Sequence, residues 1–177
     1  MNRILLIVLF FSACLSSCSK SNNVPAQIQA QAVIDNALII NYLNSKNLPI
    51  NNVDTISLTT GLAGHSGICY IIDTAGAGNS IITNSTQITV GYTGMQLTSG
   101  NGTKVFTQTN NFHPTFILGS AIRGWQLGIP KSQVKKGGTV TLYIPSRYAY
   151  GPYPQANIGL PANAVLIFDI TLYNITN

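Results

Sequence analysis

The chain has 177 residues, 45% of them hydrophobic but only 7% charged, against about 25% in average soluble domains, and its formal net charge is +5. Its nine basic residues form no dense run, which argues against nucleic-acid binding, because that needs a clustered basic stripe. The four acidic residues are all aspartates, which argues against hydrolysis by a pair of carboxylates. Because the two histidines are also isolated, the chain has no cluster of metal ligands, and we expect no metal and no cofactor.

The first residues predict an export signal. Arg3 precedes an apolar run over residues 4–15, which is too short to span a membrane and is followed by small residues. The sequence "LSSC" at 15–18 resembles the lipobox of bacterial lipoproteins, a resemblance that implies acylation of Cys18. A secretory signal cut nearby without lipid is the alternative. We expect a signal peptide at 1–17 and a lipidated tether at 18–24 in the bacterial cell envelope, and Ser19 favours an outer-membrane anchor facing the periplasm.

Residues 25–46, "PAQIQAQAVIDNALIINYLNSK", predict a helix because they are rich in Ala, Gln, Ile and Leu, lack glycine, and have proline only at the start. Val33, Ile34 and Leu38 contribute to a broad apolar stripe on this helix. The helix either packs on its own domain or contacts a partner, for which a homodimer is the candidate. We expect an N-terminal helical extension over residues 25–56.

After residue 56 the chain changes to short β-branched runs separated by Gly, Asn and Pro, such as "ICYII", "STQITVGYTGMQL", "GTVTLYIP" and "NAVLIFDITLYNIT". These residue types and their partial alternation predict antiparallel strands on one core. The segment "GSAIRGWQLGIPKSQVKKGG" predicts a short helix instead. Cys69, in an apolar run, is expected in the core. The fold class is therefore α+β, with one domain over residues 57–177.

The order of the segments resembles that of the FKBP family of peptidyl-prolyl cis–trans isomerases. The motifs that carry the resemblance are, in chain order, "VGYTG", "KVF", "FILG", "RGWQLGI", "IPSRYAYG" and "GLPANAVLIFDITL". The resemblance implies a strongly curved antiparallel sheet of five or six strands wrapped around one short helix, with a pocket between helix and sheet. It also implies proline-containing polypeptide substrates and a role in the folding of exported proteins.

Prolyl isomerisation is compatible with a chain that has few ionisable groups. Rotation about the X–Pro bond breaks amide resonance, at a barrier of ~18–20 kcal/mol, but breaks no covalent bond. A catalyst therefore has to bind the twisted amide better than the planar one. A dry apolar pocket with a few fixed hydrogen-bond donors is enough for this, without a nucleophile, base or metal.

The resemblance assigns catalytic roles to three residues: Trp125 as the pocket floor, Ile122 through its backbone N–H, and Tyr150 through its hydroxyl. Tyr148 would face the same side if that stretch is extended, and structural support is its expected role. The alternative for each aromatic residue is ordinary core packing. A further set is expected to supply the walls and rim of the pocket: Tyr92, Phe106, Thr107, Phe116, Ala121, Leu160 and Phe168.

The sequence departs from the family pattern at several places. Thr107 stands where the family usually has aspartate, and His113–Pro114 stands where an aromatic wall residue is common. The segment "NGTKVF" is one residue longer than usual. These departures favour reduced catalysis and an altered pocket wall. They leave open a binding module or chaperone for proline-containing segments, and also a structural envelope lipoprotein that acts through its N-terminal helix.

Overall fold

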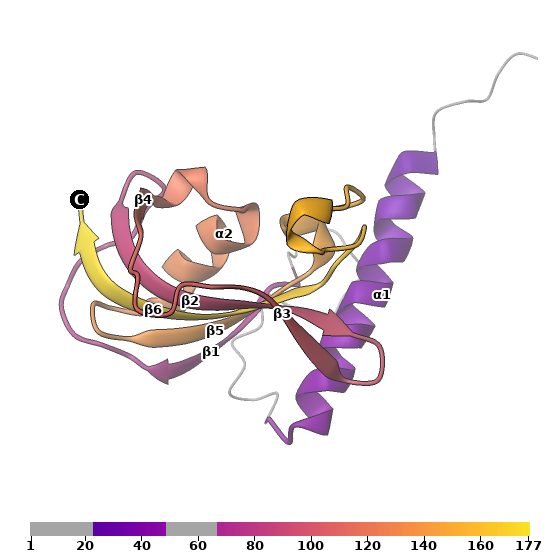
Figure 1. Ribbon diagram of the computed structural model, residues 1–177, viewed down its shortest axis with the longest axis horizontal. Helices are drawn as coiled ribbons and strands as arrows, with labels where there is room; N and C mark the ends of the chain where they lie inside the picture. The colour runs from indigo at the N-terminus through magenta and orange to yellow at the C-terminus, as the bar shows by residue number, and fades with distance from the viewer. Residues whose placement is uncertain (1–22, 49–66) are drawn as a thin grey trace, which may run out of the picture.

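The computed structural model describes residues 23–48 and 67–177, so the expected signal peptide and Cys18 lie outside the described residues. Within those ranges six strands form one antiparallel sheet in the order β1-β5-β6-β2-β3, with β4 paired to β2. Figure 1 shows the curved sheet enclosing α2 on its concave side, while α1 lies at the other end of the domain. The predicted α+β class, with a curved antiparallel sheet, one short enclosed helix and an N-terminal helix, is confirmed.

The strands follow the β-branched runs of the sequence. The two longest, β2 and β6, pair along most of their length, from Gln87 opposite Thr176 to Gln96 opposite Leu166. Both strands follow the curve of the sheet along their length (Figure 1). The strand bounds are β1 (Cys69–Thr74), β2 (Gln87–Thr98), β3 (Gly102–Gln108), β4 (Thr115–Ile117), β5 (Thr139–Ile144) and β6 (Leu166–Thr176).

Each helix is followed by a residue in the left-handed conformation. Helix α1 (Asn23–Ser45) begins two residues before the predicted start and is followed by Asn47, whose φ is 51°. Helix α2 (Arg123–Ser132) ends at Gln133, whose φ is 57°. A left-handed residue of this kind is a common helix stop. No helix in the described ranges combines the length and the hydropathy needed to cross a membrane.

The inner face of the sheet packs around α2. On β5, Val140, Leu142 and Ile144 alternate toward this face and join a buried cluster that contains Trp125 and Ile129 of α2. Residues two apart on a strand point to the same side of the sheet, so one strand supplies three contacts to the helix. The cluster fixes the distance between α2 and the sheet and thereby the depth of any cavity between them.

The outer face of the sheet has a second core, formed with α1. Ile39 and Leu43 of α1 are buried in a cluster with Tyr143, Ile167 and Cys69. The N-terminal helix therefore packs on its own domain, one of the two alternatives that its sequence left open. Burial raises the pKa of the Cys69 thiol to about 12, as expected for a cysteine that serves as a core residue.

Candidate active site

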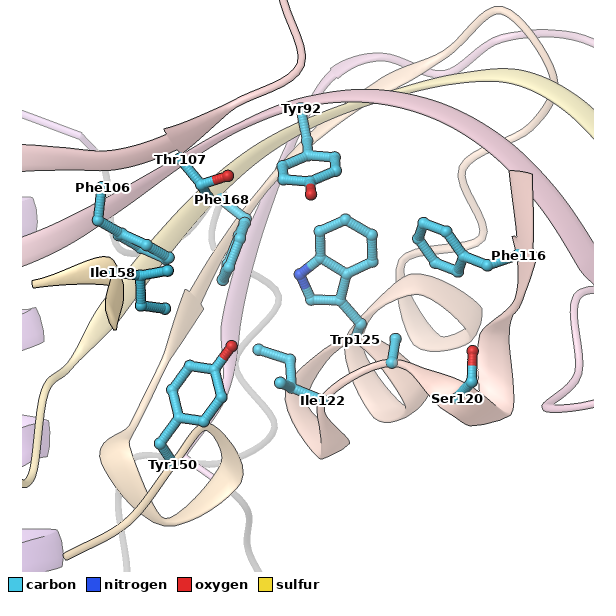
Figure 2. Close-up of a pocket in the computed structure, with 11 residues that line it drawn as sticks. Tyr92, Phe106, Thr107, Phe116, Ser120, Ile122, Trp125, Tyr150, Ile158 and Phe168 are labelled. Atoms are coloured by element: carbon cyan, nitrogen blue, oxygen red, sulfur yellow. The ribbon is translucent and has the colours of Figure 1, made fainter. Parts of the chain in front are cut away.

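A cavity of about 520 Å³ opens between α2, the inner face of the sheet and the loop that follows β5. Its walls are mostly aromatic, and Figure 2 shows their rings turned toward a common space. Nine of the ten site residues predicted from the sequence line it. The full lining is Tyr92, Phe106, Thr107, Phe116, Ser120, Ala121, Ile122, Trp125, Tyr150, Ile158 and Phe168.

Trp125 forms the floor of the cavity and is held by other aromatic rings. Its indole makes edge-to-face contacts with Tyr92 and Phe168, both at 5.2 Å between centroids and 89° between planes, and a tilted contact with Phe116 at 5.8 Å. Aromatic pairs prefer these geometries, so the three neighbours fix the orientation of the indole. Trp125 is 3% exposed and contributes to the main core as well as to the cavity.

The indole nitrogen of Trp125 is buried, and the described residues offer it no hydrogen-bond acceptor. Figure 2 shows the nitrogen edge of the ring turned toward Phe168, across the edge-to-face contact. An N–H group that faces an aromatic ring makes only a weak interaction. A buried donor without an oxygen acceptor is uncommon in folded proteins, and such groups gather at functional sites.

Ile122 occupies the position just before α2. Its carbonyl accepts the backbone N–H groups of Trp125 and Gln126, at 3.0 and 3.3 Å, which begins the helix. The first N–H groups of a helix have no acceptor within that helix. Across the described residues, the Ile122 N–H has no partner, so it is a donor at the edge of the cavity.

A β-bulge explains why two consecutive residues of β3 face the cavity. Gly94 of β2 pairs with Thr107 and the next residue, Met95, pairs with Val105, so Phe106 has no partner in the ladder. In a regular strand Phe106 and Thr107 would point to opposite faces. The extra residue of a bulge redirects its side chain, which brings both residues to the cavity. The segment "NGTKVF", which is one residue longer than in the family pattern, ends at this bulge.

Phe106 closes the aromatic wall on the side of the bulge. Its ring makes an edge-to-face contact with Phe168 at 5.7 Å. Gly94 makes this arrangement sterically feasible, because a Cβ at that position would lie 2.8 Å from the Phe168 ring and 2.9 Å from the Phe106 ring. Thr107 presents a neutral hydroxyl at the place where the family carries a carboxylate, so this part of the wall has no charge.

Tyr150 lies opposite the floor, after a short 3-10 turn (Ser146–Tyr148), and turns its hydroxyl toward the cavity. Burial raises the pKa of this phenol, and the nearby Tyr92 adds a smaller contribution in the same direction. The hydroxyl therefore stays protonated, and able to donate a hydrogen bond, at pH values beyond the ordinary range of tyrosine.

A flat pH profile follows from this lining. Activity of the site, measured as kcat/KM, is expected to vary by less than about twofold between pH 5.5 and 9, because tyrosines are the only titratable groups among the lining residues. Above pH 10 activity is expected to fall as the Tyr150 hydroxyl loses its proton. A pH series at constant ionic strength checks this. A transition near pH 6–7 would contradict it and point to a histidine.

The structure corrects the prediction for Leu160. Leu160 is 2% exposed and belongs to the main core, so it does not form the rim of the cavity. Ile158, in the 3-10 turn Ala156–Ile158, lines the cavity instead. A sequence signal was present, because Ile158 is the only large apolar residue in "PQANIG". Leu160 precedes proline in "GLP", but its backbone pairs with Gln155 and its side chain is buried.

Tyr148 and His113 differ from their predicted positions, and one residue that lines the cavity was not predicted. Tyr148 is in a 3-10 turn rather than an extended stretch, packs against the main core and has the Arg147 guanidinium 5.1 Å from its ring centre, in keeping with a supporting role. His113 is exposed, and its ring lies 3.8 Å from that of Tyr173, away from the cavity lining. Ser120, which the sequence reasoning missed, lines the cavity beside Ala121.

Comparison with known proteins decides the family. The model of the FKBP-type peptidyl-prolyl cis-trans isomerases matches residues 78–173, which is more than half of the chain. This chain belongs to that family. The matched segment contains every residue that lines the aromatic cavity.

Relatives extend the FKBP assignment. The chain is 42% identical over 113 residues to the FKBP-type peptidyl-prolyl cis-trans isomerase FkpA of Buchnera aphidicola subsp. Schizaphis graminum, covering 63% of this chain and 42% of that protein. It is 36% identical over 103 residues to FK506-binding protein 1 of Candida glabrata, covering 56% of this chain and 85% of that protein. The chain thus spans less than half the length of its Buchnera relative and most of the yeast protein.

A solved structure supports the fold. The crystal structure of FkpA from Escherichia coli superimposes with a TM-score of 0.61 at 29% sequence identity, covering 86% of this chain and 64% of that chain. The likeness therefore extends beyond the segment that the family model matches. In the described residues, no group of three or more His, Cys, Asp or Glu side chains could hold a metal ion.

Proposed function

We propose that this protein catalyses the cis–trans isomerisation of X–Pro peptide bonds in polypeptides. The observation that carries the proposal is the aromatic cavity of about 520 Å³, with Trp125 as its floor and the Tyr150 hydroxyl at its edge. A proline ring is a compact apolar group that fits against an indole face. The peptide on either side of the proline would leave the cavity through its open side.

The chemistry follows from what the cavity provides. Apolar walls remove the water that stabilises the planar, charge-separated amide, and they offer no substitute acceptor or donor over most of their surface. The Tyr150 hydroxyl and the Ile122 N–H are fixed donors for substrate carbonyls. Donors held in place stabilise the twisted amide at no cost of reorganisation.

Replacing Tyr150 with phenylalanine tests this proposal. The variant keeps the ring and removes one hydroxyl, so we expect kcat/KM for a proline-containing peptide to fall about fivefold, in line with the loss of one hydrogen bond. The measurement is a protease-coupled isomerisation assay, repeated with a protein whose refolding is limited by proline isomerisation. Tyr173→Phe, on the outer face, is the matched control and is expected to leave activity unchanged.

A second function, a binding module or chaperone for proline-containing segments, is favoured by one observation. Thr107 puts a neutral hydroxyl in the cavity where the family usually has an acid, which weakens the electrostatic support of the site. If the protein binds proline-containing peptides but does not accelerate their isomerisation, the catalytic proposal is wrong and this second function takes its place. Acceleration that is lost on competition by the same peptide supports catalysis.

We propose that this protein acts in the cell envelope, where it isomerises X–Pro bonds of exported proteins. The lipobox resemblance at residues 15–18 supports a lipid anchor at Cys18 and a tether between Cys18 and α1, which begins at Asn23, with Ser19 favouring the outer membrane. Prolyl isomerisation needs no ATP and limits the refolding of many proteins. An FKBP domain over residues 57–177 with a helical extension at 25–56 would then face the periplasm.

A homodimer through the N-terminal helix is part of the same proposal. Helix α1 buries Ile39 and Leu43 against its own sheet, but Ile28, Val33 and Ile34 remain more than half exposed on the helix. Apolar side chains left exposed on a helix are available for association with a second chain. A second copy of the chain would cover them with an equivalent helix.

A further inference from the structure

We infer that Asp35 of α1 is a positioning residue for Tyr150, so that the N-terminal helix forms part of the isomerase site. The inference deepens the function proposed above and rests on it for its kinetic consequences. It concerns a contact between residues 111 positions apart, which joins the helical extension to the turn that carries the Tyr150 hydroxyl.

The Asp35 carboxylate is a buried acceptor with three donors. Asp35 is 1% exposed, and its Oδ2 accepts hydrogen bonds from the Ser146 backbone N–H at 2.9 Å and from the Ser146 hydroxyl at 2.7 Å. Its Oδ1 accepts one from Gln31 Nε2 at 2.8 Å. Hydrogen bonds to a carboxylate are about twice as strong as neutral ones, and a buried charge needs such partners to be tolerated.

Ser146 transmits this contact to Tyr150. The Ser146 carbonyl accepts the backbone N–H groups of Ala149 at 2.9 Å and of Gly151 at 2.8 Å. These two residues flank Tyr150 in the chain, and the Gly151 N–H belongs to the peptide group that follows Tyr150, so the backbone on both sides of Tyr150 is tied to the residue that bonds to Asp35. Ser146 is itself 1% exposed, which leaves its N–H and hydroxyl no water to bond if the carboxylate is removed.

Packing alone does not fix this turn, because cavities lie on both sides of it. One is the active-site cavity, and the other, of about 850 Å³, lies between the turn and α1 and is lined by Ile28, Ile34 and Tyr150, among others. Figure 1 shows the loop after β5 standing between α2 and α1. With space on either side, the turn is held by the hydrogen bonds that Ser146 donates to Asp35 and accepts from Ala149 and Gly151, together with the bond from the Asn163 N–H to the Gly151 carbonyl at 2.8 Å.

Small displacements of a catalytic donor have large kinetic effects, because a hydrogen bond weakens steeply with distance and angle. Without the carboxylate, the buried Ser146 donors are unpaired, and the turn is expected to shift until they find water. The Tyr150 hydroxyl would then reach the substrate carbonyl in a smaller fraction of molecules. The loss should appear in kcat more than in KM, since the apolar walls that bind the proline ring are unchanged.

A double-mutant cycle in the full-length protein tests the inference. Asp35→Ala is expected to lower kcat about fivefold with less than about a twofold change in KM. In the Tyr150→Phe background the same substitution is expected to lower kcat by less than about twofold, because the hydroxyl that it positions is already absent. Asp35→Asn, which retains an oxygen acceptor for Ser146, is expected to restore at least half of the lost kcat. Asn44→Ala, at an exposed position of α1, is the control and should leave kcat unchanged.

If Asp35→Ala does not fold, Ser146→Ala replaces it in the cycle, since this change removes only the hydroxyl donor and leaves the backbone N–H bond to the carboxylate. Equal losses of kcat from the Asp35 or Ser146 substitution in both Tyr150 backgrounds would overturn the inference, because the helix would then act independently of Tyr150. Loss of activity without rescue by Asp35→Asn would overturn it as well.

Hydrogen exchange separates this inference from the proposed function. The amide protons of Ala149 and Gly151, which bond to the Ser146 carbonyl, are expected to exchange at least about tenfold faster in Asp35→Ala than in the unaltered protein, with no change in Asn44→Ala. This readout needs no isomerase activity. Unchanged exchange would overturn the inference even in an active enzyme. Faster exchange in a protein without isomerase activity would contradict the proposed function but support the contact between Asp35 and the turn.

Discussion

Trp125→Ala is expected to reduce kcat/KM for proline-containing peptides by about 100-fold and to lower the free energy of unfolding by about 3–5 kcal/mol. The indole is both the floor of the cavity and a member of the main core, at 3% exposure. Its removal merges the active-site cavity with a new void and takes away the ring that holds Tyr92 and Phe168 at 5.2 Å. The proline ring would lose its contact surface, and water would reach the amide.

The effect of lower stability on activity has to be separated from the effect of losing the indole surface of Trp125. Ile129→Ala on the same helix removes a fully buried side chain that does not line the cavity, and it is expected to lower stability by about 2–5 kcal/mol. Isomerisation should be assayed at a temperature where both variants are folded, as judged by circular dichroism. If Ile129→Ala loses as much kcat/KM as Trp125→Ala, stability rather than the indole surface accounts for the effect.

Gly124→Ala is expected to lower the free energy of unfolding by about 2 kcal/mol, although alanine usually stabilises a helix relative to glycine by roughly 0.5–1 kcal/mol. A Cβ at Gly124 would overlap the side chain of Ile144 on β5, with its Cδ1 at 2.7 Å and its Cγ1 at 3.0 Å. Contacts this short are too close for small side-chain adjustments of the buried, β-branched Ile144 to relieve, so α2 would have to rise from the sheet. Trp125, the next residue, would rise with it.

Thermal and urea unfolding measure this effect, with Gly128→Ala as the matched control one turn further along α2. At Gly128 a Cβ would lie 3.0 and 3.1 Å from the two methyl groups of Leu142, a contact that small side-chain adjustments can relieve. The control is expected to change stability by less than about 1 kcal/mol. Equal destabilisation by both substitutions would show that α2 tolerates no methyl group against the sheet and that Ile144 is not the specific obstacle.

Much of the fold was predictable because its signals are local in the sequence. The β-branched runs, the absence of glycine from the N-terminal helix and the distinct segment around "RGWQLG" each indicate their own structure. The order of the motifs then indicates the family, which brings with it the curved sheet and the place of the pocket. Trp125 and Tyr150 were assigned in this way, and the structure brings both to one cavity.

The departures arose where a side chain's direction depends on pairing between distant segments. Phe106 and Thr107 both face the cavity only because β3 has a bulge opposite Gly94 and Met95. Leu160 and Ile158 exchange roles because a short turn and a bridge to Gln155 set which of them points inward. A shift of one residue reverses the face of a strand, and the position of that shift in β3 is set by its pairing with β2.

The sequence by itself determined the chemical character of this protein: an FKBP domain with few charged residues behind an apolar N-terminal segment and a helix. The tertiary structure alone decided that the helix packs on that domain and that Asp35 reaches Ser146. The reason is that residue types and their local spacing can be read directly from the sequence. A hydrogen bond between residues 111 positions apart instead depends on how two separately formed elements pack together.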